Sequence, residues 1–267
     1  MNYSEISKEL RKKIVKLKHG SQGGHLGSAL SCIDILTVLY FKVLNIDPKN
    51  PLKEDRDRFI FSKGHAAAAW YSVLCQRGYF PESELIECVN GSKVAGHPVR
   101  NSFPGIEVST GSLGHGFPMA NGMALAAKKD DRGHNIVVMI SDGECDEGTT
   151  WESALFAQHH QLDNVTVIID YNKIQSFGRT DEVMKLDPLA KKWESFGFEA
   201  QEIDGHDFGQ IEKAFSNINS RNKKPRVIIC HTVKGKGIKE MEDTVESHYH
   251  KVTDQEFQIF TEEVEKL

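Results

Sequence analysis

An aspartate and an asparagine each follow an apolar run of this chain, and both side chains can bind a metal ion. Asp142 comes shortly after the apolar residues 136–140, and Asn172 comes shortly after residues 165–169. Between the two runs, residues 149–161 carry a helical pattern, as a crossover between parallel strands requires. Because the carboxyl ends of parallel strands meet at one edge of a sheet, we expect Asp142 and Asn172 to lie close together.

The oxygen atoms of this pair are suited to Mg²⁺. A carboxylate, a side-chain amide oxygen and a nearby backbone carbonyl are hard ligands of the kind that Mg²⁺ prefers. A cation held in this way typically also binds the phosphate groups of a substrate or cofactor. An isolated Asp-Gly pair most often marks only a turn after a strand, but its place between two apolar strands joined by one helix favours a diphosphate site with its metal.

Length and composition favour a single large domain. The 267 residues show no composition break, linker or repeat, so we expect a single domain over residues 1–267. A net charge of −5 with dispersed lysines argues against a nucleic-acid partner. With no apolar run of membrane-spanning length and no signal-peptide core, we expect no membrane partner. An odd number of cysteines without metal-ligand spacing predicts reduced thiols in a cytoplasmic protein.

Periodicity predicts alternating strands and helices, hence a doubly wound, mostly parallel α/β sheet with helices on both faces. A first helix should end at Gly20, before a turn over residues 21–24. Residues 91–116 are rich in Gly, Ser, Pro and His without periodicity, which predicts a long functional loop. Further helices are expected over residues 31–43, 66–76, 83–89, 119–128, 188–196 and 208–219, and further strands over residues 58–61, 198–203 and 226–231.

Most of the twelve histidines have no sequence feature that indicates function. A lone histidine is more often a surface or hydrogen-bonded core residue than a catalytic one. His25, His65 and His97 differ, because each follows a glycine in a turn at an element boundary, where the backbone can approach a ligand closely. The residues interpreted as structural are His19, His134, His159, His160 and His206.

Six segments, in order along the chain, resemble the motifs of the transketolase family. The longest spans residues 141–180 and begins Ser-Asp-Gly-Glu. The others are Gly-His-Leu-Gly at 24–27, Phe-Ser-Lys-Gly-His at 61–65, Gly-His-Pro at 96–98, Gly-Ser-Leu-Gly-His-Gly at 111–116 and Thr-Val-Lys-Gly-Lys-Gly at 232–237. The likeness covers nearly the whole chain, and the chain is most similar to the stand-alone amino-terminal subunit of a split transketolase.

The resemblance implies a thiamine diphosphate site built around the metal. Asp142, Asn172 and the carbonyl of Ile174 would bind Mg²⁺, with Ca²⁺ or Mn²⁺ as substitutes, against the two phosphates of the cofactor. Gly143, Glu144 and Asn172 would also lie beside the cofactor. One departure from the family pattern is Ser141, which replaces a glycine and is compatible with the motif if its φ is negative.

The resemblance also gives roles to residues outside the metal motif. His25 and His97 would line the substrate channel and hydrogen-bond the sugar, and His65 would reach the diphosphate. Two alignments compete for a late histidine that contacts diphosphate and substrate: His248 is preferred, and His250 is the alternative cofactor contact. The residues expected to border the thiamine pyrimidine are Gly111, Ser112 and Leu113.

The implied activity is the transfer of a two-carbon ketol unit from a ketose or ketose phosphate to an aldose. It would require a separately encoded subunit that carries the pyrimidine-binding and carboxyl-terminal domains, in an α₂β₂ assembly. A second hypothesis is the α subunit of another thiamine diphosphate enzyme, such as a 2-oxo acid dehydrogenase, a decarboxylase or an acyloin-forming synthase. A third is an inactive regulatory or scaffolding subunit, which the intact set of Asp142, Asn172 and His65 argues against.

Overall fold

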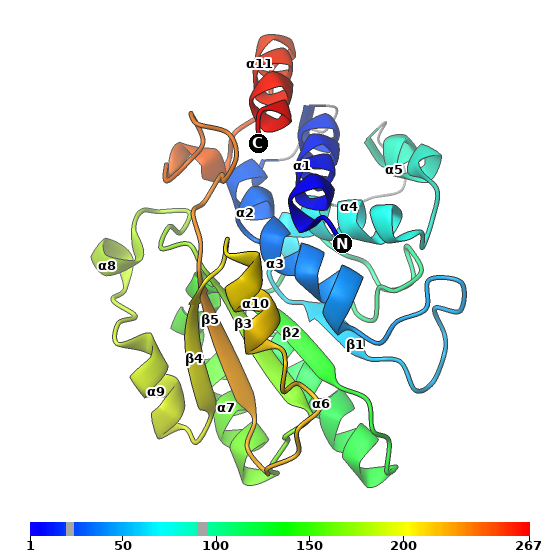
Figure 1. Cartoon of the computed structure of the whole chain (residues 1–267). Coiled ribbons are helices and arrows are strands. Elements are labelled where there is room, and N and C mark those ends of the chain that lie inside the picture. The colour runs from blue at the N-terminus through cyan, green and yellow to red at the C-terminus, as the bar shows by residue number, and fades with distance from the viewer. Residues whose placement is uncertain (20–23, 90–95) are drawn as a thin grey trace.

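One parallel sheet organises the chain (Figure 1). The computed structural model describes residues 1–19, 24–89 and 96–267, without the side chains of residues 86–89. In the described part of the chain, five strands pair in the order β1-β2-β3-β5-β4. The strands are β1 (Arg58–Phe61), β2 (Ile136–Ser141), β3 (Val165–Tyr171), β4 (Glu199–Asp204) and β5 (Arg226–His231). The expected end of the first helix at Gly20, the turn at 21–23 and the loop residues 91–95 lie outside the described residues.

The register brings the ends of β2 and β3 level. Ile136 pairs with Val165 at one end, and Ser141 pairs with Asp170 at the other. All four strand pairings in the described sheet are parallel, so every strand presents its carboxyl end at the same edge. We call this the carboxyl edge, and the opposite one the amino edge. The chain leaves β2 and β3 at the carboxyl edge directly before the predicted metal-binding residues.

Helices cover both faces of the sheet, because successive residues of each buried strand point to opposite sides. Val137 and Met139 face a core that α1 (Tyr3–His19), α2 (Leu26–Ser31), α3 (Ile33–Val38), α4 (Ala67–Arg77), α10 (Phe208–Ala214) and α11 (Asp254–Glu265) help to build. Val138 and Ile140 face a second core, to which α6 (Gly116–Lys129), α7 (Gly148–His159) and α9 (Leu189–Ser195) contribute. The predicted doubly wound α/β fold is confirmed.

Some element bounds differ from the sequence-based expectation. The helix predicted over residues 31–43 is wrong as a single element: α2 ends at Ser31, α3 follows, and a π-helical turn occupies Leu39–Val43. The residues from 26 to 40 are buried, so no polar face marked the breaks. Helix α10 ends at Ala214, before the expected 219, and the short α8 (Thr180–Val183) was not predicted. Helix α5 (Glu82–Val89) lies where a helix was expected.

Two further features concern the described residues only. Within these ranges, no helix has both the length and the apolarity needed to cross a bilayer. Four cysteines are buried free thiols: Cys32, Cys75, Cys145 and Cys230.

Candidate active site

Asp142 and Asn172 meet at the carboxyl edge, as their positions after β2 and β3 predicted. The Asp142 carboxylate accepts a hydrogen bond from the backbone N–H of Lys173 (2.7 Å), which ties the two strand ends together. Its other oxygen accepts from the N–H of Gly143 (2.8 Å). The side-chain oxygen of Asn172 accepts from the N–H of Ile174 (3.1 Å), so Asn172 is tied to the backbone of the residue whose carbonyl was predicted as the third ligand.

The charge on Asp142 is poorly compensated. Burial and the neighbouring carboxylate of Asp170 raise the pKa of Asp142 to about 7. The side chain is almost fully buried, with 2% exposed, and its hydrogen bonds come from backbone N–H groups. A buried carboxylate in this state is stabilised by a cation. The donors therefore fit a hard divalent ion.

A metal site of this kind uses few carboxylates. Among the described residues, no group of three or more His, Cys, Asp or Glu side chains is arranged to hold a metal ion. The predicted set of Asp142, Asn172 and the Ile174 carbonyl contains only one such side chain, so it depends on neutral oxygen donors and on the phosphates of a ligand.

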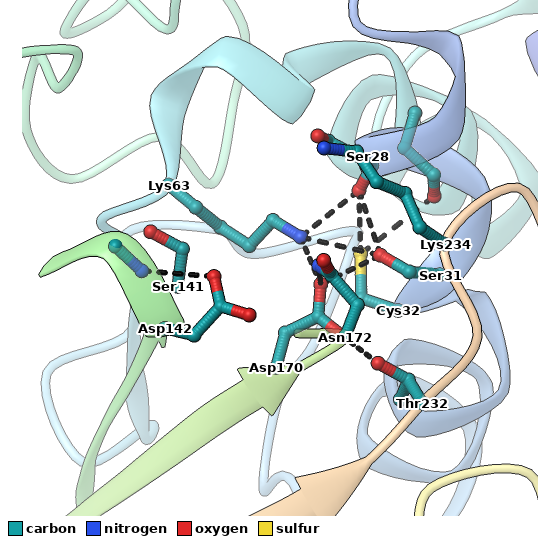
Figure 2. Close-up of polar contacts among 12 residues, drawn as sticks. Ser28, Ser31, Cys32, Lys63, Ser141, Asp142, Asp170, Asn172, Thr232 and Lys234 are labelled. Atoms are coloured by element: carbon teal, nitrogen blue, oxygen red, sulfur yellow. Dashed lines mark hydrogen bonds and ion pairs between the residues drawn. The ribbon is translucent and has the colours of Figure 1, made fainter. Parts of the chain in front are cut away.

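A buried ion pair lies behind this edge (Figure 2). The Lys63 ammonium forms an ion pair with Asp170, and both side chains are fully buried. Asp170 also accepts hydrogen bonds from the hydroxyls of Ser31 (2.6 Å) and Thr232 (2.5 Å) and from the Asn172 amide (3.3 Å). Burial alone would raise the pKa of Asp170, but Lys63 and the hydrogen bonds from Ser31 and Thr232 hold it below its usual value. The pair thus orients Asn172.

Three of the predicted histidines form one cluster beside the carboxyl edge. The ring of His25 lies 5.1 Å from that of His65 and 4.8 Å from that of His248, measured between centroids. The rings of His65 and His248 are 5.8 Å apart. Burial lowers the pKa of His25 to about 4 and that of His248 to about 3, and nearby lysines act in the same direction. Burial also holds the pKa of His65 well below its usual value. The cluster is therefore neutral at pH 7.

Lys234 connects the histidine cluster to the carboxyl edge. Its buried ammonium nitrogen lies 2.8 Å from the Ile174 carbonyl and 2.8 Å from Nδ1 of His248. Burial lowers the pKa of Lys234 to about 8. Sequence reasoning gave no role to this residue. Its signal was a lysine between Val233 and Gly235, inside a glycine-containing turn that belongs to a family motif.

His97 and the glycine loop lie at the rim of the cluster. The exposed ring of His97 packs against Gly111, where an added Cβ would lie 2.7 Å from Cδ2 of the ring. Gly111 has a φ of 144°, so the close approach and the backbone conformation both require glycine. Next to it, Ser112 is exposed and Leu113 is half-buried. These residues lie within one loop segment, as predicted.

Glu144 and Ser141 have internal partners in the structure. Glu144 is fully buried and accepts hydrogen bonds from the Ser62 hydroxyl and from the N–H groups of Gly114 (3.0 Å) and Ser141 (2.9 Å). Its side chain therefore joins β2 to the glycine loop and does not face a ligand. Ser141 has a φ of −89°, which is the negative value that the substitution for glycine requires.

The structure favours His248 over His250 as the late histidine. His248 is buried within the cluster, and its backbone carbonyl accepts a hydrogen bond from the N–H of His25. His250 lies outside the cluster, with its ring 6.1 Å from that of Phe260 and its Nε2 3.0 Å from the Glu256 carboxylate. The predicted cofactor contact of His250 therefore has no support from its position.

Comparison with known proteins agrees with this geometry. The family model described as transketolase, thiamine diphosphate binding domain, matches residues 4–264. The chain belongs to the transketolase family. It is 46% identical over 257 residues to an apulose-4-phosphate transketolase subunit of Actinobacillus succinogenes, covering 94% of this chain and 92% of that protein. It is 42% identical over 245 residues to the 6-deoxy-6-sulfo-D-fructose transketolase subunit SqwG of a Clostridium species, covering 91% of this chain and 89% of that protein.

Solved transketolases share the fold over the full length of this chain. The transketolase of Campylobacter jejuni superposes with a TM-score of 0.87 at 33% identity, and that of Leishmania mexicana with 0.87 at 26%. The matches cover 98% and 100% of this chain, but only 42% and 45% of those proteins. This transketolase-family chain thus spans less than half the length of the solved transketolases, whereas it spans nearly all of the subunit-type relatives.

Proposed function

We propose that this chain is the thiamine-diphosphate-binding subunit of a two-component transketolase. With a separate partner subunit, it would transfer a two-carbon ketol unit from a ketose or ketose phosphate to an aldose. The observation that supports this most directly is that Asp142 and Asn172 both accept hydrogen bonds from the backbone of residues 173–174 at the carboxyl edge, next to neutral histidines. When bound, thiamine diphosphate supplies the carbanion chemistry of such a reaction.

The residues of the carboxyl edge would anchor the diphosphate end of the cofactor. We propose that Asp142, Asn172 and the Ile174 carbonyl bind Mg²⁺, and that Ca²⁺ or Mn²⁺ can replace it. The Lys234 ammonium lies beside the Ile174 carbonyl and would add positive charge toward the phosphates. His65 belongs to the same cluster and would donate a hydrogen bond to a phosphate oxygen.

The neutral histidines would bind and orient the sugar. His25 has a buried Nδ1 without a hydrogen-bond partner within the described part of the chain, and a buried polar atom of this kind is expected to have one. A sugar hydroxyl or carbonyl would provide it. Because Nδ1 of His248 lies 2.8 Å from the Lys234 ammonium, which can only donate, its proton is on Nε2. His97 would close the outer side of this channel.

The partner would be a separately encoded subunit with the pyrimidine-binding and carboxyl-terminal domains. Two observations support it: this chain spans less than half of the solved transketolases, and similar proteins of its own length are named as subunits. The small-residue helix α6 offers a surface for the partner, since a Cβ added at Gly122 would meet no atom within 4 Å and Ala126 is exposed. Leu155 on the adjacent α7 is 60% exposed. We propose an α₂β₂ assembly in the cytoplasm.

The names of the relatives suggest a substrate class. One relative is named for apulose-4-phosphate and another for 6-deoxy-6-sulfo-D-fructose, and both sugars carry a terminal anionic group. We propose that this chain also acts on a ketose with such a group, in which case its anion would be bound outside the histidine cluster. The neutral state of the cluster suits the uncharged end of the sugar.

Reconstitution tests the proposal. The purified chain is mixed with the candidate partner subunit, Mg²⁺ and thiamine diphosphate, and ketose phosphates are screened as donors against an aldose acceptor. Ketol transfer by the mixture, and none by either component alone, is the expected result. Full transfer by this chain alone would contradict the need for a partner. Turnover of pyruvate in place of ketose phosphates would favour the 2-oxo acid hypothesis, and Mg²⁺-independent binding of the cofactor would contradict the metal site.

A further inference from the structure

His206, which the sequence gave no reason to select, contacts both a buried ion pair and the backbone of the turn that carries Lys234. Its Nδ1 lies 2.7 Å from a carboxylate oxygen of Asp34 on α3. Its Nε2 accepts a hydrogen bond from the backbone N–H of Val233 (2.8 Å). Since Nε2 accepts, Nδ1 carries the proton and donates it to Asp34. Both ring nitrogens are thus occupied, and the ring is held in one tautomer.

The other side of Asp34 is held by an arginine of α1. Arg11 forms two hydrogen bonds to the Asp34 carboxylate, at 2.9 and 2.8 Å, and the Ser7 hydroxyl adds a third at 2.6 Å. Burial opposes the charge on Asp34, but Arg11 and the hydrogen bonds from His206 and Ser7 keep its pKa well below the usual value. The side chains of Arg11 and Asp34 are 4% and 7% exposed, so solvent screens this pair little.

Arg11 also reaches the far end of the same turn. Its Nε donates to the carbonyl of Lys236 (3.0 Å), while His206 accepts from the N–H of Val233. The two contacts therefore hold the turn on both sides of Lys234. The three side chains come from α1, α3 and the segment between β4 and α10, and apolar residues of α1, α3 and α10 pack in the same core. We call Arg11, Asp34 and His206 the turn clamp.

The turn itself is tightly enclosed. Gly235 has a φ of 80°, and a Cβ added there would lie 2.1 Å from the Met241 carbonyl oxygen. Its N–H donates to the Gly27 carbonyl (3.0 Å), which places the turn against α2 and close to the histidine cluster. A small rotation of such a turn would move the long Lys234 side chain away from His248. The direction of Lys234 thus depends on how the ends of the turn are fixed.

We infer that the turn clamp positions Lys234, with His206 as a positioning residue that acts on the active site through the Val233 N–H. The clamp sets where the Lys234 ammonium lies relative to His248 and the Ile174 carbonyl, and it thereby fixes the tautomer of His248. This inference rests on the proposed function for its catalytic meaning, but its contacts lie entirely within this chain.

Two substitutions separate positioning from simple packing. In His206→Asn the amide group lies near the former Nδ1, so the contact with Asp34 is kept and the contact with Val233 is lost. In His206→Gln the amide oxygen reaches the former Nε2 and can accept from Val233, while Asp34 keeps Arg11 and Ser7. Each variant loses one hydrogen bond, so both should show similar shifts in the midpoint of thermal unfolding. A matched control is His19→Asn, which removes the contact of 2.7 Å between Nε2 of His19 and the Asp254 carboxylate, outside the turn clamp.

The first measurement uses the isolated chain, without metal or cofactor. Long-range ¹⁵N–¹H spectra of the histidine rings report which nitrogen carries the proton. We expect the Nε2-protonated tautomer for His248 in the wild type, His206→Gln and His19→Asn, and a mixture of tautomers in His206→Asn. If His248 has the same tautomer in His206→Asn as in His206→Gln, the inference is overturned.

The second measurement uses the reconstituted complex with thiamine diphosphate and Mg²⁺ as the probe. We expect His206→Asn to weaken cofactor binding about tenfold or more, as changes to groups that orient ligands do, and His206→Gln to stay within about twofold of the wild type. Equal losses in the two variants would mean that His206 has only a structural role. If the wild-type complex binds no cofactor, the proposed function fails, whereas the tautomer measurement still decides whether the clamp acts on Lys234.

Discussion

Buried aspartates lie at both edges of the parallel sheet, and their surroundings differ. At the amino edge, Asp57 accepts hydrogen bonds from two backbone N–H groups and from the Asn135 amide, and Asp163 accepts from the Lys223 N–H and the Lys128 ammonium. At the carboxyl edge, burial and a second carboxylate raise the pKa of Asp142 to about 7. The same residue type is thus fully paired where it joins elements and under-compensated where a ligand would bind.

The comparison distinguishes two uses of burial. At the amino edge, enclosed polar groups satisfy one another, as structural groups usually do. At the carboxyl edge, Lys63 and Asp170 also satisfy each other, but burial lowers the pKa values of Lys234, His25 and His248 and raises that of Asp142, so the charged forms of these four side chains are disfavoured. A charged ligand would stabilise the charged forms of these groups, and perturbed pKa values of this kind are expected at a functional site.

The largest effect should come from the ion pair behind the carboxyl edge. Lys63→Met leaves the charge of Asp170 buried without its partner, and we expect the free energy of unfolding to fall by about 3–5 kcal/mol. Lys128→Met removes a partner of Asp163 at the amino edge, where the lysine is 34% exposed, and should lower it by at most about 1 kcal/mol. Urea unfolding of both variants measures the difference. Equal losses would mean that the two edges are not electrostatically distinct.

The second prediction separates binding from stability. Asp142→Asn should weaken Mg²⁺-dependent binding of thiamine diphosphate at least about 100-fold. This loss is larger than the loss usually caused by changing residues that only orient metal ligands. It should not lower the free energy of unfolding, because it removes an uncompensated buried carboxylate. Asp163→Asn should do the opposite, with cofactor affinity unchanged and about 1–3 kcal/mol of stability lost through unmade hydrogen bonds. Calorimetry of the reconstituted complex and urea unfolding test both halves of this exchange.

The third prediction follows from the raised pKa of Asp142. The folded carboxyl binds its proton more tightly than the unfolded one, whose pKa is 3.8, so the metal-free chain should lose stability as pH rises from 3.8 to about 7. Below pH 7 the proton competes with the metal, and the apparent Mg²⁺ affinity should fall by up to about tenfold per pH unit. Calorimetry at pH 6 in buffers of different ionisation enthalpy should show about one more proton released by the wild type than by Asp142→Asn. Equal proton release in the two proteins would contradict this reading of Asp142.

How much of the molecule the sequence predicted depends on the distance between partners along the chain. The strands and the meeting of Asp142 with Asn172 followed from local apolar runs, because parallel pairing brings strand ends together. The ion pair between Lys63 and Asp170 joins residues 107 positions apart, so no local pattern predicts it. Asp170 also lies at the end of an apolar run, where nothing in the sequence singles it out.

The roles of His248, His250 and His206 were difficult to predict from the sequence, for two different reasons. His248 and His250 lie two positions apart, so the pattern alone could not choose between them, whereas the burial and ring contacts of His248 do. His206 looked structural because its partner Asp34 is 172 residues away and its effect passes through a backbone N–H, which leaves no mark in the sequence. Candidate binding residues were therefore visible in the sequence, but the residues inferred to position them were not.

The smallest effect concerns the surface proposed for the partner subunit, which belongs to neither edge of the sheet. Gly122 lies within α6 with open space where its Cβ would be, so Gly122→Ala should raise the free energy of unfolding of the isolated chain by about 0.5–1 kcal/mol through helix propensity. Gly122→Arg should leave the isolated chain folded but prevent its association with the partner, because a long charged side chain would stand in a closely packed helix contact. Sedimentation of the mixed subunits measures association, and Gly122→Ala serves as the control. Full association of Gly122→Arg would place the partner on another face, and the site at the carboxyl edge would then have to be completed from there.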